Sequence, residues 1–292
     1  MNILDAYKKL ITSLFFFPVI YLLGWLIISF FQLFLPSITI DKALFGTIIT
    51  LIIFIFVLPL WSKSRWSIDK LWNSLGFDLT FLYNKKLSIK LLLEIFKAFL
   101  IIVFITSLLL LGNYATIKYE INSFVFLNSI FLGFIVALGE ELAFRVWLFQ
   151  ELRLVFDKRA SNLLQALIFA LCHFRQDLSF LDNLQIIIGL CLLGTYLNKW
   201  REKKYRTLLF PIFFHSGIVG FWFLFTNSFI QIKGTIPNIF FGPGEGQYIN
   251  PIGGLIAILI LLILNFYRLP VLRTILSERG RTVRESFRDD LP

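Results

Sequence analysis

The chain has 292 residues, of which 58% are hydrophobic and 16% are charged, and its formal net charge is +10. Soluble domains carry about a quarter charged residues, so this composition, with a mean hydropathy of +0.79, excludes an ordinary soluble domain and indicates a membrane protein. The positive charge alone would also fit a nucleic-acid-binding protein, but the sequence contains no nucleic-acid-binding module, phosphate-binding glycine-rich loop or dinucleotide-binding motif.

Long apolar runs recur along the chain. A transmembrane helix needs about 20 apolar residues to cross a hydrocarbon core about 30 Å thick. The first run follows Lys8 and Lys9, but it is too long for the apolar region of a signal peptide and no cleavage site follows it, so we expect it to be retained. The sequence therefore predicts an all-α, polytopic membrane protein with eight transmembrane helices, at 13–35, 43–61, 91–112, 122–150, 161–174, 184–198, 207–227 and 253–268.

The distribution of lysine and arginine sets the expected orientation. With eight spans, both termini and three loops lie on one side of the membrane, which then carries 22 Lys and Arg residues against 4 on the other side. Because cytoplasmic loops are enriched in these residues, we predict that both termini are cytoplasmic. Residues 1–268 would form one integral membrane domain, in a bacterial-type plasma membrane, and residues 269–292 a basic cytoplasmic tail near anionic lipid.

Four ionisable residues inside the predicted spans stand out as candidate site residues, which are Glu140 and Glu141 in the fourth span, His173 in the fifth and His215 in the seventh. Such groups are costly in membrane helices and usually face a cavity or one another. At 1.5 Å per residue, Glu140, His173 and His215 lie about 12–18 Å along their helices from the predicted cytoplasmic ends. The three groups are therefore expected to converge at one depth.

The spacing of these residues separates the expected roles of the two glutamates. Glu141 and Arg145 form an i,i+4 pair and can neutralise each other. Glu140 points about 100° away from that face, so we expect it to work with His173. Phe169 lies four residues before His173 and could hold the imidazole in position. A carboxylate beside an imidazole in a water-accessible pocket can act as a general base, and a second imidazole can donate a hydrogen bond to an oxyanion.

Three short motifs carry a resemblance to a known family. "EELAFR" (140–145) fits the pattern EExxxR, "FALCH" (169–173) fits FxxxH, and His215 begins a third motif. Together, over residues 122–227, they resemble the CPBP family of intramembrane proteases, named for CAAX proteases and bacteriocin-processing (Abi-type) proteins. The resemblance implies an all-helical eight-span core, a catalytic cavity open to the cytoplasm and glutamate-dependent hydrolysis of peptide bonds.

The resemblance also implies a role for each matching residue. Glu140 and His173 would activate water, His215 would help to stabilise the oxyanion, and Glu141 and Arg145 would support the site. One position departs from the family pattern, which usually has Asn or Asp four residues after the third-motif histidine. Here that position is Val219, which cannot donate a hydrogen bond. Trp222, seven residues after His215 on the same helix face, is a candidate replacement as oxyanion donor.

Two other chemistries are compatible with these residue types. One glutamate and two histidines could bind zinc, but there is no HExxH motif, so we predict that the protein needs no metal or other cofactor and keep zinc as the alternative. Cys172 adjoins His173 and could suggest a thiol nucleophile. Because adjacent helical positions point about 100° apart, we expect a buried structural cysteine instead.

The favoured function is an intramembrane endopeptidase that acts on membrane-anchored protein or peptide substrates near the cytoplasmic face, within the lipid bilayer and with no nucleic-acid partner. The alternative, motivated by Val219, is a non-proteolytic scaffold or immunity-type protein of the same fold that binds a partner. A transporter is a third possibility, because polar residues within spans also mark ion pathways. The polar residues show no two-fold repeat, which argues against a transporter.

Overall fold

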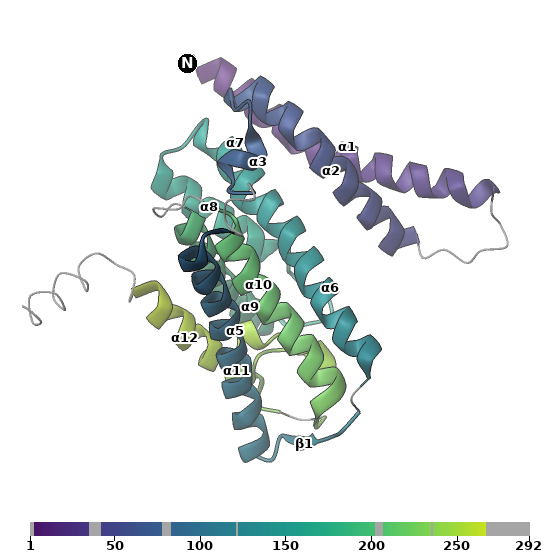
Figure 1. The fold of residues 1–292 in the computed structure, drawn as a ribbon, viewed down its shortest axis with the longest axis vertical. Coiled ribbons are helices and arrows are strands. Elements are labelled where there is room, and N and C mark those ends of the chain that lie inside the picture. Colours follow the sequence, from purple (N-terminus) through teal and green to yellow (C-terminus); the bar gives the residue numbers. More distant parts are fainter. Residues whose placement is uncertain are drawn as a thin grey trace, which may run out of the picture. The chain divides into compact units, whose positions relative to one another are not determined.

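The computed structural model describes residues 3–34, 42–77, 83–120, 122–201, 207–234 and 236–266, and the predicted tail at 269–292 lies outside them. Most described residues are helical, as predicted (Figure 1). The helices are α1 (Ile3–Phe34), α2 (Lys42–Trp66), α3 (Leu71–Ser74), α5 (Lys85–Leu111), α6 (Ser123–Glu140), η1 (Glu141–Leu148), α7 (Phe149–Arg153), α8 (Lys158–Leu171), α9 (Phe180–Arg201), α10 (Leu209–Leu224), η2 (Phe225–Phe229), α11 (Asn238–Phe241), η3 (Gly246–Tyr248), η4 (Pro251–Gly253) and α12 (Leu255–Phe266). The strands are β1 (Ala115–Ile117) and β2 (Ile230–Ile232).

Among the described residues, six helical segments are long and apolar enough to cross a membrane. They are Ile11–Phe34, Phe45–Trp66, Lys85–Leu111, Ser123–Arg153, Phe180–Lys199 and Leu209–Phe229. The protein is thus an integral, multi-pass membrane protein. The predicted spans at 161–174 and 253–268 do form helices, but α8 has 14 residues and α12 has 12 described residues. Helices of this size are about 18–21 Å long, shorter than the hydrocarbon core. The count of eight and the orientation therefore stay predictions.

The described chain divides into two compact units. The first combines Met1–Lys97, Ile130–Gln165 and Trp200–Gly220, and the second combines Ala98–Ser129, Ala166–Lys199 and Phe221–Pro292. Several helices pass from one unit into the other, since α5, α6, α8 and α10 each contain a boundary. The single membrane domain predicted for residues 1–268, with its core at 122–227, stays a prediction.

The core of the first unit is rich in aromatic side chains. Helices α1 and α2 lie side by side (Figure 1) and present Phe16 and Phe54 to a shared cluster. Phe16 stacks on Trp147 of η1, with ring centroids 5.1 Å apart and ring planes inclined by 17°. Phe17 meets the same indole edge-on at 4.7 Å. Aromatic pairs of this kind contribute about 0.5–1.5 kcal/mol each beyond their burial, so this cluster fixes the α1–α2 pair against η1.

Helices α6 and α10 approach each other closely at Gly133. A Cβ atom at this position would lie 2.6 Å from the carbonyl oxygen of Ser216 and 3.0 Å from the nitrogen of Gly220. Both neighbours are backbone atoms, which cannot swing aside. Small residues at helix crossings in membranes allow such close packing. The crossing at Gly133 therefore sets the separation of α6 and α10, the two helices that carry Glu140 and His215.

Gly133→Ala is expected to destabilise the protein by about 1–3 kcal/mol, because the added methyl group forces the two backbones apart. The matched control is Gly46→Ala, since a Cβ there would meet only ordinary contacts, the nearest at 3.7 Å from Ile28. Removing that helical glycine should be neutral or stabilising by up to about 1 kcal/mol. Unfolding of the two variants in detergent, compared with wild type, measures both effects, and equal stability of the variants would contradict the close crossing.

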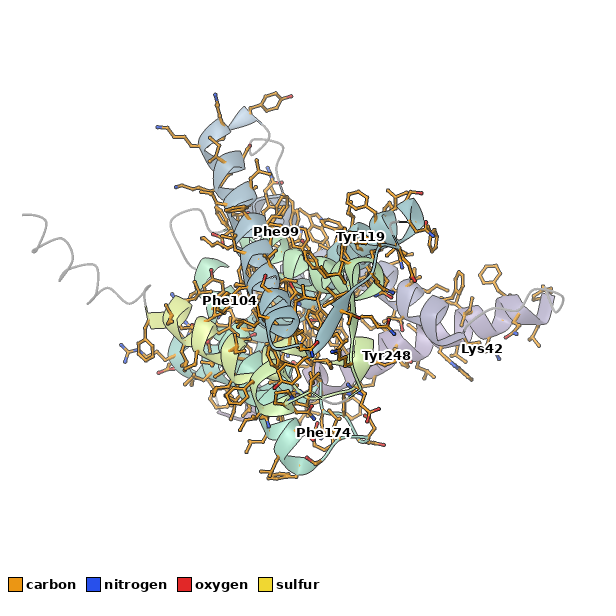
Figure 2. All side chains as sticks on the ribbon, turned by 90° about the horizontal axis from the view of Figure 1, so that it is seen from below. Lys42, Phe99, Phe104, Tyr119, Phe174 and Tyr248 are labelled. Carbon is orange, nitrogen blue, oxygen red and sulfur yellow. The ribbon has the colours of Figure 1, made fainter. Side chains whose placement is uncertain are left out.

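The second unit contains a small sheet that the sequence analysis did not predict. Strands β1 and β2 pair antiparallel with Ala115 opposite Ile232 and Ile117 opposite Ile230. On the helices of this unit, apolar side chains such as Phe104 on α5 are half exposed, as expected for contact with lipid (Figure 2). Tyr119, directly after the sheet, is also exposed (Figure 2).

Candidate active site

The two adjacent glutamates lie where an α-helix becomes a π-helix. Glu140 is the last residue of α6, and Glu141 begins η1, whose eight residues are π-helical, before the chain continues as α7. Short π-helical segments inside α-helices are rare and occur frequently at functional sites. The sequence analysis assumed a regular α-helix through this region, and no residue pattern in it indicated the change of helix type.

Glu141 is the centre of a buried charge cluster. Its Oε1 atom lies 2.9 Å from Nδ1 of His215 and 3.2 Å from Nη1 of Arg145. The side chains of Glu141 and Arg145 are fully buried. A buried charge without a partner is strongly destabilising, and here the carboxylate and the guanidinium meet within one helix. The structure therefore contains the Glu141–Arg145 ion pair that the i,i+4 spacing predicted, together with a bond to His215 that it did not predict.

Glu140 faces the other ring nitrogen of the same histidine. Its Oε2 atom lies 3.6 Å from Nε2 of His215, just beyond hydrogen-bond distance. The two glutamates differ in exposure, because the side chain of Glu140 is 27% exposed and that of Glu141 is 0% exposed. One imidazole, 5% exposed, thus lies between a carboxylate that is partly accessible and one that is buried.

The hydrogen bond to Glu141 determines that one ring nitrogen of His215, Nδ1, carries a hydrogen. An ionised carboxylate can only accept, so Nδ1 of His215 carries a hydrogen. A neutral ring then has its lone pair on Nε2, toward Glu140, whereas a protonated ring presents an N–H there. A protonated ring can thus donate a hydrogen bond on the side of Glu140.

His173 and Phe169 form a second small cluster, in the second unit. His173 was expected within a helix, but α8 ends at Leu171 and His173 lies in the turn that follows. Its Nδ1 atom lies 2.8 Å from the carbonyl oxygen of Phe169, and the two rings meet edge-on with centroids 4.8 Å apart. Because a carbonyl oxygen only accepts, Nδ1 carries the hydrogen and a neutral ring has its lone pair on Nε2.

The two histidine clusters belong to different units. Glu140, Glu141, Arg145 and His215 come together in the first unit, and His173 with Phe169 in the second. The predicted convergence of His173 with Glu140 stays a prediction.

Three further residues from the sequence analysis have clear positions. The indole N–H of Trp222 donates to the carbonyl oxygen of Ile249 at 3.1 Å, so its use as an oxyanion donor would require that bond to open. Val219 is half-buried on α10. Cys172 was expected to be buried, and this was wrong, because the cysteine is exposed in the turn after α8.

A buried glutamate outside the three motifs was missed by the sequence analysis. Glu151 on α7 is 2% exposed and accepts hydrogen bonds from Trp61 at 2.9 Å, from Trp66 at 2.8 Å and from Arg65, whose Nη2 atom lies 2.7 Å from it. The partners lie 85 to 90 residues earlier in the chain. No local spacing could have indicated them.

The described ranges contain no group of three or more His, Cys, Asp and Glu side chains arranged to hold a metal ion.

Residues 122–221 match a family model described as type II CAAX prenyl endopeptidase Rce1-like. Over this segment the chain is similar to the Rce1-like endopeptidases, which belong to the CPBP family. The resemblance drawn from the three motifs is thus confirmed, and the matched segment includes Glu140, His173 and His215. The similarity to this family supports the coarse assignment of the protein as a membrane-embedded protease.

A second family model, for a domain of unknown function (DUF8676), matches residues 2–70, which contain α1 and α2. No curated protein and no solved structure matches the chain.

Proposed function

We propose that the protein is an intramembrane endopeptidase that hydrolyses peptide bonds of membrane-associated protein or peptide substrates near the cytoplasmic face of the membrane. The observation that carries the proposal is the unequal environment of two adjacent glutamates around one histidine. Glu141 is fully buried and bonded to Arg145 and His215, whereas Glu140 is partly exposed on the other side of the imidazole. A carboxylate that is both held near a catalytic imidazole and accessible to water suits general-base catalysis.

In the proposed reaction, Glu140, acting together with His173, takes a proton from a water molecule as the water oxygen attacks the carbonyl carbon of the scissile peptide bond. The carbonyl oxygen becomes an oxyanion in the tetrahedral intermediate. Protonated His215, held by Glu141, donates a hydrogen bond to that oxyanion from Nε2, and such a donor typically contributes about 10²–10³ in rate. The proton taken from water then passes to the leaving amine as the carbon–nitrogen bond breaks.

Metal-free hydrolysis is part of this proposal, and zinc is the alternative. Substrates with a prenylated C-terminus, peptide precursors and other membrane-anchored segments are all compatible with the proposed chemistry. Val219 favours a second candidate function, because it removes a donor that the family pattern supplies at this position. In that case the protein keeps the fold but acts as a non-proteolytic scaffold or immunity-type protein that binds a partner.

His173→Ala and His215→Ala are each expected to lower the cleavage rate by about 10²–10⁴-fold. The first change removes a group that helps to take a proton from water, and the second removes a donor to the oxyanion. The assay uses the purified full-length protein in detergent with a panel of quenched fluorescent peptides, some carrying a farnesylated C-terminal cysteine. Cys172→Ala is the matched control, since it changes the exposed neighbour of His173 and should leave the rate unchanged.

Two outcomes would contradict the proposed mechanism. Equal cleavage by wild type and both histidine variants would exclude the assigned roles. Loss of cleavage on dialysis against a chelator, restored by zinc, would replace the metal-free mechanism with the zinc alternative. If the wild type cleaves no peptide of the panel and a Glu140→Gln strain keeps the wild-type phenotype, the partner-binding function is favoured.

A further inference from the structure

A cavity of about 310 Å³ opens in the first unit between the N-terminal part of α1 and the C-terminal end of α2. Its lining is Lys9 and Thr12 from α1 and Trp61, Ser64 and Arg65 from α2. A volume near 300 Å³ is at the lower end of the range for small-molecule sites in proteins. The cavity shares no lining residue with the candidate active site, and the proposed function makes no use of it.

Two lining residues of the cavity, Arg65 and Thr12, belong to a polar network that also contains Glu151. Arg65 donates from Nε to both carboxylate oxygens of Glu151, at 2.8 and 2.9 Å, and from Nη1 to the hydroxyl of Thr12 at 2.9 Å. Its Nη2 atom also donates to the carbonyl oxygen of Lys9. The guanidinium lies 5.0 Å from the ring of Trp61, which gives a cation–π contact. Arg65 is therefore held in one orientation and needs little reordering to accept a ligand above it.

The charge of the cavity is positive. Lys9 and Arg65 supply two positive charges, and Glu151, which forms an ion pair with Arg65, supplies one negative charge. Within the part of the chain that the structure describes, no carboxylate forms an ion pair with the ammonium of Lys9. This ammonium can donate three hydrogen bonds, and the exposed hydroxyl of Ser64 can add another after rotation. The cavity thus offers hydrogen-bond donors and a net positive charge to an anion.

The cavity also lies where a lipid headgroup is found. Lys9 lies two residues before the apolar span Ile11–Phe34, and Arg65 lies at the end of the span Phe45–Trp66. Trp61 and Trp66 occupy the last turns of that span, and tryptophan is enriched at the interface between lipid and water. Basic pockets between transmembrane helices are known sites for anionic headgroups.

We propose that this cavity binds the phosphate ester of an anionic lipid headgroup. Lys9 and Ser64 would contact the phosphate oxygens, with Arg65, Thr12 and Trp61 as the other lining residues. The same chemistry would accept free inorganic phosphate, so the experiment must distinguish the two sources. The proposal rests on the first unit alone and does not depend on proteolytic activity.

The test measures lipid binding to the delipidated full-length protein by native mass spectrometry. Phosphatidylglycerol added to this protein is expected to bind, and added phosphatidylcholine is expected to bind much more weakly. Lys9→Gln should weaken binding of phosphatidylglycerol about fivefold, since a basic residue near anionic lipid contributes about 1 kcal/mol. The control is Lys63→Gln, which removes the same charge one residue from Ser64, because Lys63 is 70% exposed, pairs with Asp69 and does not line the cavity. Ser64→Phe, which fills the cavity without changing charge, should also weaken binding.

Each outcome decides one point. Loss of binding in Lys9→Gln and Ser64→Phe but not in Lys63→Gln supports the cavity. Equal weakening by Lys9→Gln and Lys63→Gln would show general attraction to surface charge and overturn the proposal, as would equal binding of the two lipids to wild type. Displacement of the lipid by millimolar inorganic phosphate would assign the site to phosphate itself. If the lipid stays bound in the presence of millimolar inorganic phosphate, the site is assigned to the lipid headgroup.

Discussion

Glu140→Gln is expected to lower the rate of peptide cleavage by about 10²–10⁴-fold while leaving the fold intact. The amide cannot accept a proton from water, so the general base is lost. The side chain of Glu140 is 27% exposed, and glutamine has nearly the same size, so the free energy of unfolding should change little. The measurement pairs the peptide-cleavage assay with thermal unfolding of the same preparation.

Glu141→Gln is the matched comparison for this prediction. It changes the neighbouring residue in the same chemical way, but this carboxylate is fully buried against Arg145 and His215. Removing its charge takes from the buried Arg145 guanidinium the carboxylate with which it forms an ion pair, and such losses typically cost about 3–5 kcal/mol. Glu140→Gln should therefore be stable and inactive, and Glu141→Gln unstable. Full activity in Glu140→Gln, or the reverse order of stabilities, would contradict the division of roles.

Glu151→Ala is expected to destabilise the protein by about 3–5 kcal/mol, because it leaves the guanidinium of Arg65 buried without its carboxylate. Arg65 is only 12% exposed at its side chain. The indole N–H groups of Trp61 and Trp66 and the hydroxyl of Ser13 lose the same acceptor. The free energy of unfolding, measured in detergent by chemical denaturation, tests this. Glu151→Gln, which keeps the volume and one acceptor oxygen, should fall between wild type and Glu151→Ala.

The control for Glu151 is an ion pair at the surface. Asp69→Ala removes the partner of Lys63, whose side chain is 70% exposed, across a distance of 3.4 Å. Exposed pairs contribute little to stability, so the change should stay within about 0.5 kcal/mol. If Glu151→Ala costs no more than Asp69→Ala, the buried network does not hold α1 and α2 to α7.

Much of the membrane character could be predicted from the sequence, because lipid imposes a strong local rule. A spanning helix must satisfy its backbone internally over about 20 apolar residues, and six such helices are present in the described chain. The rule does not decide whether short segments span the membrane. Helix α8 buries Ser161 and Gln165, so the apolar run that predicted a span at 161–174 belongs to a shorter helix with a polar buried face.

The candidate site was predictable where its contacts are local. The Glu141–Arg145 pair follows from a spacing of four residues, and the bond between His173 and the Phe169 carbonyl from the same spacing. The contact between Glu141 and His215 spans 74 residues, and the network at Glu151 spans up to 138. Tertiary packing sets these distances, and one sequence gives no local signal for them. The π-helical geometry of η1 likewise arises from packing.

The continuous helix α6–η1–α7 is held at two places on either side of its glutamate pair. Gly133 sets its approach to α10, and Glu151 ties its end to α2 through Arg65. These two attachments fix the rotational phase of the helix as well as its position. Loss of one residue between them would turn the two ends relative to each other by about 100°. Glu141 could then meet His215, or Glu151 could meet Arg65, but not both. The length of this segment is thus constrained as tightly as the identity of its acidic residues, and among related chains we expect substitutions here but no insertions or deletions.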